Sequence, residues 1–235
     1  MKHEANEPGR MAPGSGQGVI LCNGEFPRKE YPLYLLKSAD VIVCCDGSRN
    51  VQRLERLGLE PTVIVGDMDS TPRAVKEKYA DRLVRVEEQD DNDLAKAFAL
   101  MRERWPEISE IHILGAGGRN EAHTVGNLGW LMEWERRSLD ETGFGLAVRG
   151  INVDMVSDWS TAFAVSGSTA LHVGEGRKIS FFTTDPSLEI KSKGLQWPLD
   201  QVKFDAWWKA TLNRASDDVV SLVFNHPAPV LVILD

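Results

Sequence analysis

Acidic residues are clustered at three places where side chains could do chemistry. The clusters contain Asp46, then Asp67 and Asp69, then Asp90 and Asp93, and each follows a short apolar segment. Asp67 and Asp69 flank one residue, so in an extended segment both carboxylates point the same way. Asp90 and Asp93 share one face at a helix start. Singly, such residues favour turns and helix N-caps. Together they would repel one another without a cation, so we predict a Mg²⁺ site completed by water and substrate phosphates.

Two glycine-containing turns could supply phosphate-binding groups. One runs from Leu114 to Arg119 and leads into a helix-like segment, and the other contains Asn23 and Gly24. Backbone N–H groups in such turns, together with a helix N-terminus, cradle phosphates. The pattern G-x-G-x-x-G is absent because Asn120 stands at its last glycine, and the chain has no P-loop sequence. Any phosphate site therefore lacks a standard nucleotide-binding motif.

Composition narrows the classes of function. The chain has 235 residues and a net charge of −8, from 35 acidic and 27 basic residues. This balance disfavours non-specific binding to nucleic acid, which relies on Lys and Arg. The apolar runs are too short to cross a bilayer, which needs about 20 residues. The three cysteines do not form a disulfide framework, so we expect a cytoplasmic protein with no membrane association.

The first half of the chain predicts a parallel sheet that would position these groups. Apolar segments alternate with helix-like segments, which is typical of helices packed on both faces of a sheet. We expect strands at 19–22, 41–45, 63–65, 83–86 and 111–114. The acids and the glycine turns follow these strands, and ligands on such sheets bind at the carboxyl ends of the strands.

The second half predicts an antiparallel β architecture. After about Ser138 helical periodicity largely stops, and short alternating segments punctuated by Gly and Pro follow, as in a sandwich or barrel. We therefore predict a disordered tail over residues 1–17, an α/β domain over 18–140 and an all-β domain over 150–235.

Several blocks of sequence occur in a characteristic order. They are Cys45-Asp46-Gly47-x-x-Asn50, Gly66-Asp67-x-Asp69-Ser70, Gln89-Asp90-x-x-Asp93-x-x-Lys96-Ala97, Gly115-Ala116-x-Gly118…His123-Thr124, and a tail with Gly194-Leu195-Gln196-Trp197-Pro198-Leu199 and Thr211-Leu212-Asn213. In order and spacing they resemble the thiamine pyrophosphokinase family, over essentially the whole chain from Val19.

The resemblance implies a fold, a reaction and a set of residues. The fold is a Rossmann-like catalytic domain followed by a C-terminal β-sandwich, in a homodimer that binds thiamine between its subunits. The reaction is transfer of the pyrophosphoryl group of ATP to the thiamine hydroxyl, with Mg²⁺, releasing AMP. By position, the metal and catalytic residues are Asp46, Asp67, Asp69 and Asp93. The ATP-binding residues are Asn23, Gly24, Asp46, Gly47, Ser70, Asp90, Gly115, Gly118, Arg119 and His123. Trp197 and Asn213 are expected to bind thiamine.

The chain departs from the family pattern in the glycine block. That block usually continues Arg-x-Asp-His-Thr, but Asn120 and Ala122 stand at the Arg and Asp positions. We hypothesise that Arg119 or Glu121 partly compensates, and His123 is open between a phosphate contact and a role in the helix cap. Two other functions stay open: a diphosphokinase acting on another acceptor, such as a hydroxymethylpterin, and a non-catalytic relative that binds thiamine or nucleotide.

Overall fold

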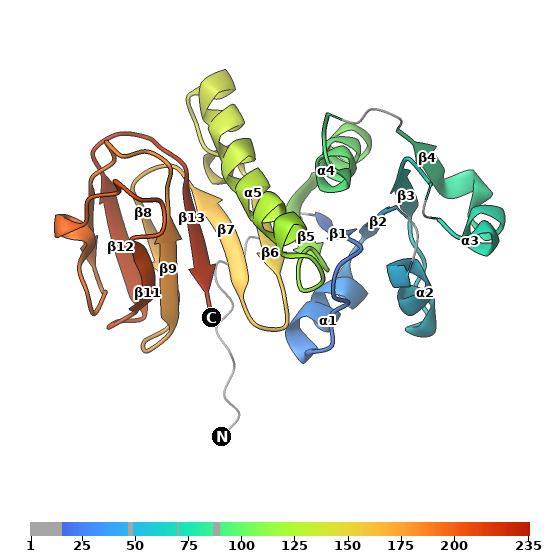
Figure 1. Cartoon of the computed structure of the whole chain (residues 1–235), viewed down its shortest axis with the longest axis horizontal. Coiled ribbons are helices and arrows are strands. Elements are labelled where there is room, and N and C mark those ends of the chain that lie inside the picture. Colours follow the sequence, from blue (N-terminus) through green and yellow to red (C-terminus); the bar gives the residue numbers. More distant parts are fainter. Residues whose placement is uncertain (1–15, 47–48, 70, 87–89) are drawn as a thin grey trace. The chain divides into compact units, whose positions relative to one another are not determined.

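The computed structural model describes residues 16–46, 49–69, 71–86 and 90–235, and the chain divides into two compact units. The parallel-sheet unit contains residues 16–130 and Gly150–Trp159, and the antiparallel unit contains Leu131–Arg149 and Ser160–Asp235 (Figure 1). Helix α5 (Glu121–Thr142) begins in the first unit and ends in the second. The predicted tail lies outside the described residues except for Gly16 and Gln17, which belong to the first strand.

Six parallel strands form the sheet of the parallel-sheet unit, in the order β6-β5-β1-β2-β3-β4. Figure 1 shows α1 and α2 on one side of this sheet and α4 on the other. The strands are β1 (Gly16–Leu21), β2 (Val41–Cys45), β3 (Val63–Gly66), β4 (Leu83–Arg85), β5 (Ile108–Leu114) and β6 (Asn152–Val156). The helices are α1 (Glu30–Ser38), α2 (Arg49–Arg56), α3 (Arg73–Lys78), α4 (Asp93–Arg104) and a 3₁₀ turn at Ala80–Arg82.

The central strands are apolar on both faces because helices cover both faces. All residues of β2 and β3 are buried. The expected apolar stripe of α4 is also buried, at Leu94, Ala97, Phe98 and Met101. The α4 helix begins where the side chain of Asn92 accepts the N–H of Ala95 at 2.9 Å, which is an N-cap.

Strand β6 differs from the expectation that residues from 150 onward belong to the antiparallel domain. It pairs in parallel with β5, from Glu110 beside Asn152 to Leu114 beside Val156. The preceding helix α5 runs to Thr142, so β5, α5 and β6 form a β-α-β connection. The change in periodicity near Ser138 marks the approach to the end of that helix, and not the end of the parallel sheet.

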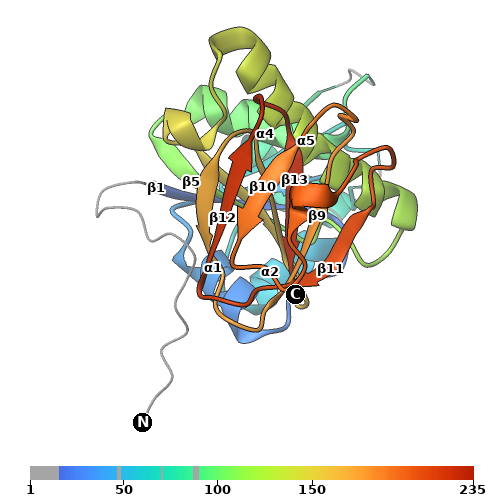
Figure 2. The ribbon, with the colours of Figure 1, turned by 90° about the vertical axis from the view of Figure 1, so that its left-hand side faces the viewer.

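The antiparallel unit is built from two sheets. One has the order β11-β9-β13-β7 and the other β10-β12-β8. Figure 2 shows β10 and β12 of the second sheet side by side. Buried residues of both sheets, such as Phe181, Leu222 and Val232, share one apolar core, so the sheets form a sandwich. The elements are β7 (Thr161–Val165), β8 (Thr169–His172), β9 (Lys178–Phe182), β10 (Ile190–Lys193), β11 (Ala210–Arg214), β12 (Val219–Phe224) and β13 (Val230–Leu234), with 3₁₀ turns at Ala147–Arg149 and Leu199–Gln201.

These two architectures confirm the predicted fold class, an α/β region followed by an antiparallel β region. Among the described helices, we find none with the length and apolar character that crossing a membrane requires.

Candidate functional site

A cavity of about 790 Å³ lies at the carboxyl ends of the parallel strands. Strand β1 lies between β2 and β5, so the order of strands reverses at β1, and ligands bind in the crevice at such a reversal. The cavity walls come from the segments after β1, β3, β4 and β5, from the last residue of β2, and from the first turns of α4 and α5. Predicted site residues that line it are Asn23, Gly24, Asp67, Asp90, Asp93, Gly115, Arg119 and His123.

The two glycine turns fit against each other in the wall of the cavity. The N–H of Gly24 donates to the carbonyl of Gly115 at 2.6 Å, and the N–H of Glu25 donates to Gly117 at 2.8 Å. A Cβ atom at position 24 would collide with the carbonyl oxygens of Gly115 and Gly117. Gly115 itself has a φ of 66°, which favours glycine. The close approach of the turns therefore requires both glycines.

Asn50, in helix α2, holds the turn after β1 in place by hydrogen bonds. Its Nδ2 donates to the carbonyl oxygens of Cys22 at 2.6 Å and Gly24 at 3.2 Å. The side chain is buried, and its contacts bridge more than 25 residues of sequence. Asn50 belongs to the first sequence block, but nothing in its spacing assigned it this role.

The acidic residues form a mutually repelling group. Burial, followed by the negative charges of Asp46 and Asp67, raises the pKa of Asp93, while Lys96 and His123 oppose the shift. Asp46 is itself buried, and its Oδ1 accepts a hydrogen bond from Thr71 Oγ1 at 2.9 Å. Asp67 Oδ1 accepts the N–H of Asp69 at 2.9 Å. The structure thus brings Asp46, Asp67 and Asp93 within electrostatic reach of one another.

The donor set suits a divalent cation of the kind predicted. Within the described ranges, no group of three or more His, Cys, Asp or Glu side chains is close enough to enclose an ion by itself. Mg²⁺ does not need such an enclosure, because it commonly takes one or two carboxylates and completes its shell with water and substrate phosphates. Burial, followed by the negative charges of Asp46 and Asp67, raises the pKa of Asp93, and a nearby cation would favour the ionised carboxylate.

Asn120 explains one departure from the family pattern. Its Oδ1 accepts the N–H of His123 at 3.1 Å and its carbonyl accepts the N–H of Thr124 at 3.0 Å, so Asn120 caps helix α5. The side chain of His123 needs no part in that cap, and His123 lines the cavity. Arg119 Nη1 donates to the carbonyl of Asn23 at 2.8 Å and also lines the cavity.

Other lining residues had no assigned role. Lys96 is buried one helical turn after Asp93 and adds positive charge. Asn127 Nδ2 donates to the carbonyl of Ala116 at 2.8 Å, and its Oδ1 accepts from Asn92 at 3.3 Å. A sequence signal existed only for Lys96, which stands in the third block. Asn127 bonds to Ala116 and Asn92, and no sequence pattern relates these three positions.

Two cysteines line the cavity without suiting catalysis. The Sγ atoms of Cys22 and Cys45 are 3.7 Å apart. The hydrogen bond to Cys22 and burial raise the pKa of the Cys45 thiol. A thiol that stays protonated is a poor nucleophile. These cysteines are therefore part of the wall, and they are free thiols, as is the buried Cys44.

The remaining predicted residues lie apart from the cavity lining or outside the described residues. Asp46, Asp69 and Gly118 do not line it, and Gly47 and Ser70 lie outside the described residues. Trp197 and Asn213 belong to the antiparallel unit. The Nδ2 of Asn213 donates to the carbonyl of Trp197 at 2.6 Å, and its Oδ1 accepts the N–H of Trp197 at 3.2 Å. Asn213 therefore holds the backbone beside Trp197, whose side chain is 56% exposed.

Comparisons with known proteins agree on one family. The model for the catalytic domain of thiamin pyrophosphokinase matches residues 33–141, and the model for its substrate-binding domain matches residues 161–227. A relative described as thiamine pyrophosphokinase 1 from Oryza sativa subsp. japonica is 27% identical over 209 residues, covering 77% of this chain and 73% of the relative.

Solved structures share the fold at lower identity. Thiamin pyrophosphokinase from Candida albicans has a TM-score of 0.71 at 16% identity, covering 95% of this chain and 94% of that chain. The protein from Geobacillus thermodenitrificans has a TM-score of 0.71 at 18% identity, covering 93% of this chain and 96% of that chain.

Proposed function

Because the chain belongs to the thiamin pyrophosphokinase family of enzymes, we propose that it transfers the pyrophosphoryl group of ATP to the thiamine hydroxyl, giving thiamine diphosphate and AMP. The observation that carries this proposal is the acidic cavity at the strand reversal, where Asp67 and Asp93 line the same space as the turns at Gly24 and Gly115. Carboxylates that could bind a cation, next to glycine turns that could bind phosphate, suit a polyphosphate that binds as its metal complex.

Charge explains why the substrate would be a metal complex. Four aspartates line the cavity, at positions 67, 90, 91 and 93, against the cationic side chains of Lys96 and Arg119. A bare triphosphate would be repelled by such a wall. Bound Mg²⁺ neutralises phosphate charge and orients the group for in-line transfer. The residues that would hold it are Asp46, Asp67, Asp69 and Asp93.

The chain's own groups would bind and orient ATP around that charge. Lys96 and Arg119 would offset negative charge on the phosphates, and the start of α5 contributes its N-terminal dipole next to the glycine turn. Asn23 Oδ1 is buried without a hydrogen-bond partner, so a nucleotide donor would satisfy it. Little covalent chemistry is asked of the protein, because positioning and electrostatic stabilisation dominate phosphoryl transfer.

Thiamine would be bound by the antiparallel unit, which the substrate-binding domain model matches. Trp197 offers an exposed aromatic face suited to the cationic thiazolium ring. Asn213 would act by fixing the backbone beside Trp197.

We also propose that the protein is a homodimer, as the resemblance implies, and that it is cytoplasmic. The half-exposed Trp207 and Trp208 near Trp197 in the sequence favour burial against another surface, and the buried free thiols suit a reducing compartment. If thiamine binds between subunits, specific activity falls on dilution below the dimer dissociation constant. Sedimentation and activity measured over the same concentration range would test this.

The test of the reaction is AMP formation by the purified protein with Mg-ATP, with and without thiamine, with a chelator as control. We expect AMP and thiamine diphosphate in equal amounts, dependent on both thiamine and the metal. Asp93→Asn serves as the inactive control and Asp185→Asn, in the antiparallel unit, as the active one. AMP formed only with a hydroxymethylpterin would support the other acceptor, and no AMP from a folded sample with any acceptor would overturn the proposal.

A further inference from the structure

Asp46 is held in place by several independent constraints. Its φ is 39°, in the left-handed region that side chains other than glycine rarely adopt. Its N–H donates to the carbonyl of Val65 at 2.8 Å. A Cβ at Gly66 would lie 3.2 Å from the Cα and Cβ of Asp46, so the absence of a side chain there lets the two strand ends approach. Backbone held in such a conformation is concentrated at functional sites.

Thr71 adds a contact that crosses from one acidic segment to another. Its Oγ1 donates to Asp46 Oδ1 at 2.9 Å, over 25 residues of sequence. Thr71 is 5% exposed and Asp46 is 8% exposed, so water competes little for this hydrogen bond. A hydrogen bond to an ionised acceptor is about twice as strong as a neutral one.

Thr71 also closes the turn that carries the second acidic cluster. Its N–H donates to the carbonyl of Met68 at 3.3 Å, and its Oγ1 lies 3.6 Å from Met68 Sδ. Met68 has a φ of 67°, so the turn is sharp. Within the same turn the N–H of Asp69 binds Asp67 Oδ1. One hydroxyl therefore joins the end of β2 to the turn after β3.

We propose that Thr71 is a positioning residue that couples Asp46 to the turn carrying Asp67 and Asp69, and so presets these carboxylates for a divalent cation and its triphosphate. The identity of that ligand rests on the proposed function. Residues that orient ligating carboxylates change metal affinity or activity by about 10- to 100-fold when they are replaced.

The test compares variants by nucleotide binding, which needs no turnover. The probe is the Mg²⁺ complex of α,β-methylene-ATP. In this analogue a methylene group replaces the oxygen between the α- and β-phosphorus atoms, where the bond would break during transfer. Affinity is measured by calorimetry. Thr71→Val removes the donor at nearly constant shape and is expected to weaken binding about 10- to 100-fold. Thr71→Ser keeps the donor and is expected to restore affinity to within about threefold. Thr71→Ala is a second donor-free variant if T71V does not fold.

A matched control separates positioning from packing. Thr183 is buried in the antiparallel unit, and its Oγ1 donates to the carbonyl of Pro229 at 3.0 Å. Thr183→Val should lower the melting temperature about as much as T71V while leaving nucleotide affinity within about twofold. In an Asp46→Ala background, T71V should have little further effect, because the side chain that accepts its hydrogen bond is gone.

Turnover supplies a second readout. With saturating ATP and thiamine, T71V should raise the Mg²⁺ concentration needed for half-maximal rate more than it lowers kcat. Wild-type binding by T71V, or equal loss in T71V and T71S, would overturn the role of the hydroxyl. If wild-type protein neither binds the analogue nor forms AMP, the proposed function itself fails, and the role of Thr71 fails with it.

Discussion

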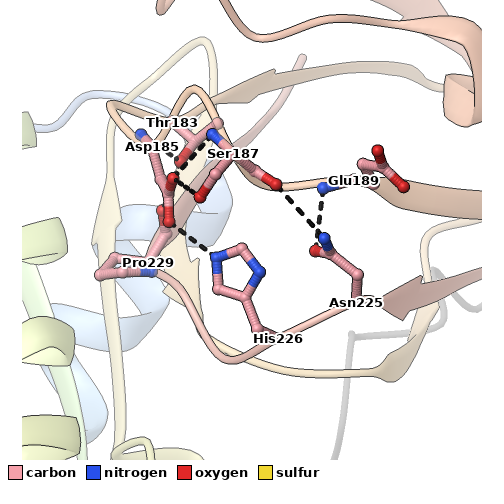
Figure 3. A network of polar contacts seen from close by, with 7 residues as sticks. All are labelled: Thr183, Asp185, Ser187, Glu189, Asn225, His226 and Pro229. Atoms are coloured by element: carbon pink, nitrogen blue, oxygen red, sulfur yellow. Dashed lines mark hydrogen bonds and ion pairs between the residues drawn. The ribbon is translucent and has the colours of Figure 1, made fainter.

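Two aspartates, one in each unit, have opposite electrostatic surroundings. In the parallel-sheet unit, burial and the charges of Asp46 and Asp67 raise the pKa of Asp93. In the antiparallel unit, hydrogen bonds from His226 and Ser187 lower the pKa of Asp185 to about 2. The first carboxylate lines a cavity, and the second closes a network of polar contacts between two loops (Figure 3).

The network around Asp185 is satisfied by the chain itself. Asp185 Oδ2 pairs with His226 Nε2 at 2.8 Å, and its Oδ1 accepts both the N–H and the hydroxyl of Ser187. Asn225 ties the same loops, since its Oδ1 accepts the N–H of Glu189 at 2.9 Å. The chain itself supplies the partners of Asp185, whereas we propose that an external cation offsets the charge of Asp93 and its neighbours. The two aspartates therefore illustrate a structural role and a proposed functional one.

Of the variants considered, Asp93→Asn should have the largest effect on activity. The rate of AMP formation is expected to fall about 10³-fold, or about 4 kcal/mol, because the variant loses a charged carboxylate that we propose as a ligand of the metal–phosphate complex. The melting temperature should hold or rise, because the amide removes repulsion with Asp46 and Asp67. Steady-state kinetics and calorimetry measure the two effects. A folded variant that keeps wild-type activity would remove Asp93 from the site.

Gly24→Ala tests whether the cavity depends on the fit of its two turns. The added Cβ would collide with Gly115 and Gly117, and overpacking of this kind costs about 1–3 kcal/mol. We expect a melting temperature lower by several degrees and weaker nucleotide binding. Gly126→Ala is the control, because a Cβ there meets open space on a helix and should stabilise it. Equal melting temperatures for both variants would contradict the proposed fit.

Asp185→Asn should lower stability by about 1 kcal/mol near neutral pH and leave activity unchanged, because the pair is partly exposed and screened. Since the folded pKa of Asp185 lies below the unfolded value, its stabilisation is present above about pH 4 and is lost as the pH falls toward 2. The difference in unfolding free energy between the variant and the wild type should therefore shrink over that window. If this difference in unfolding free energy stayed constant as the pH fell, the loss of stability would come from altered packing and not from the charge of Asp185.

Ala122→Asp addresses the altered glycine block and should have the smallest effect. Ala122 is exposed in the first turn of α5, where an acidic residue gains about 0.5 kcal/mol from the helix dipole. If Arg119 or Glu121 compensates for the missing Asp, the rate should rise less than about threefold. A large gain in kcat would instead indicate that the natural loop limits catalysis.

Sequence patterns predicted the scaffold better than the contacts within the site. The buried apolar segments specified β1 to β5, because a strand covered on both faces must be apolar throughout. They did not assign β6 to the parallel sheet, because β6 belongs to that sheet only through its pairing with β5. Acids placed after strands predicted much of the cavity lining. Hydrogen bonds made by Asn50 and Thr71 to distant segments leave no periodic signal in the sequence, so only the three-dimensional structure reveals them.

The position of β1 between β2 and β5 affects how the chain emerges during synthesis. One neighbour of β1 begins at Val41, but the other begins only at Ile108. Translation at about 5–20 residues per second leaves one edge of β1 unpaired for roughly 5–20 s. An open apolar edge invites pairing with other chains. The nascent protein therefore has a vulnerable interval, which ends when β5 pairs with the open edge of β1.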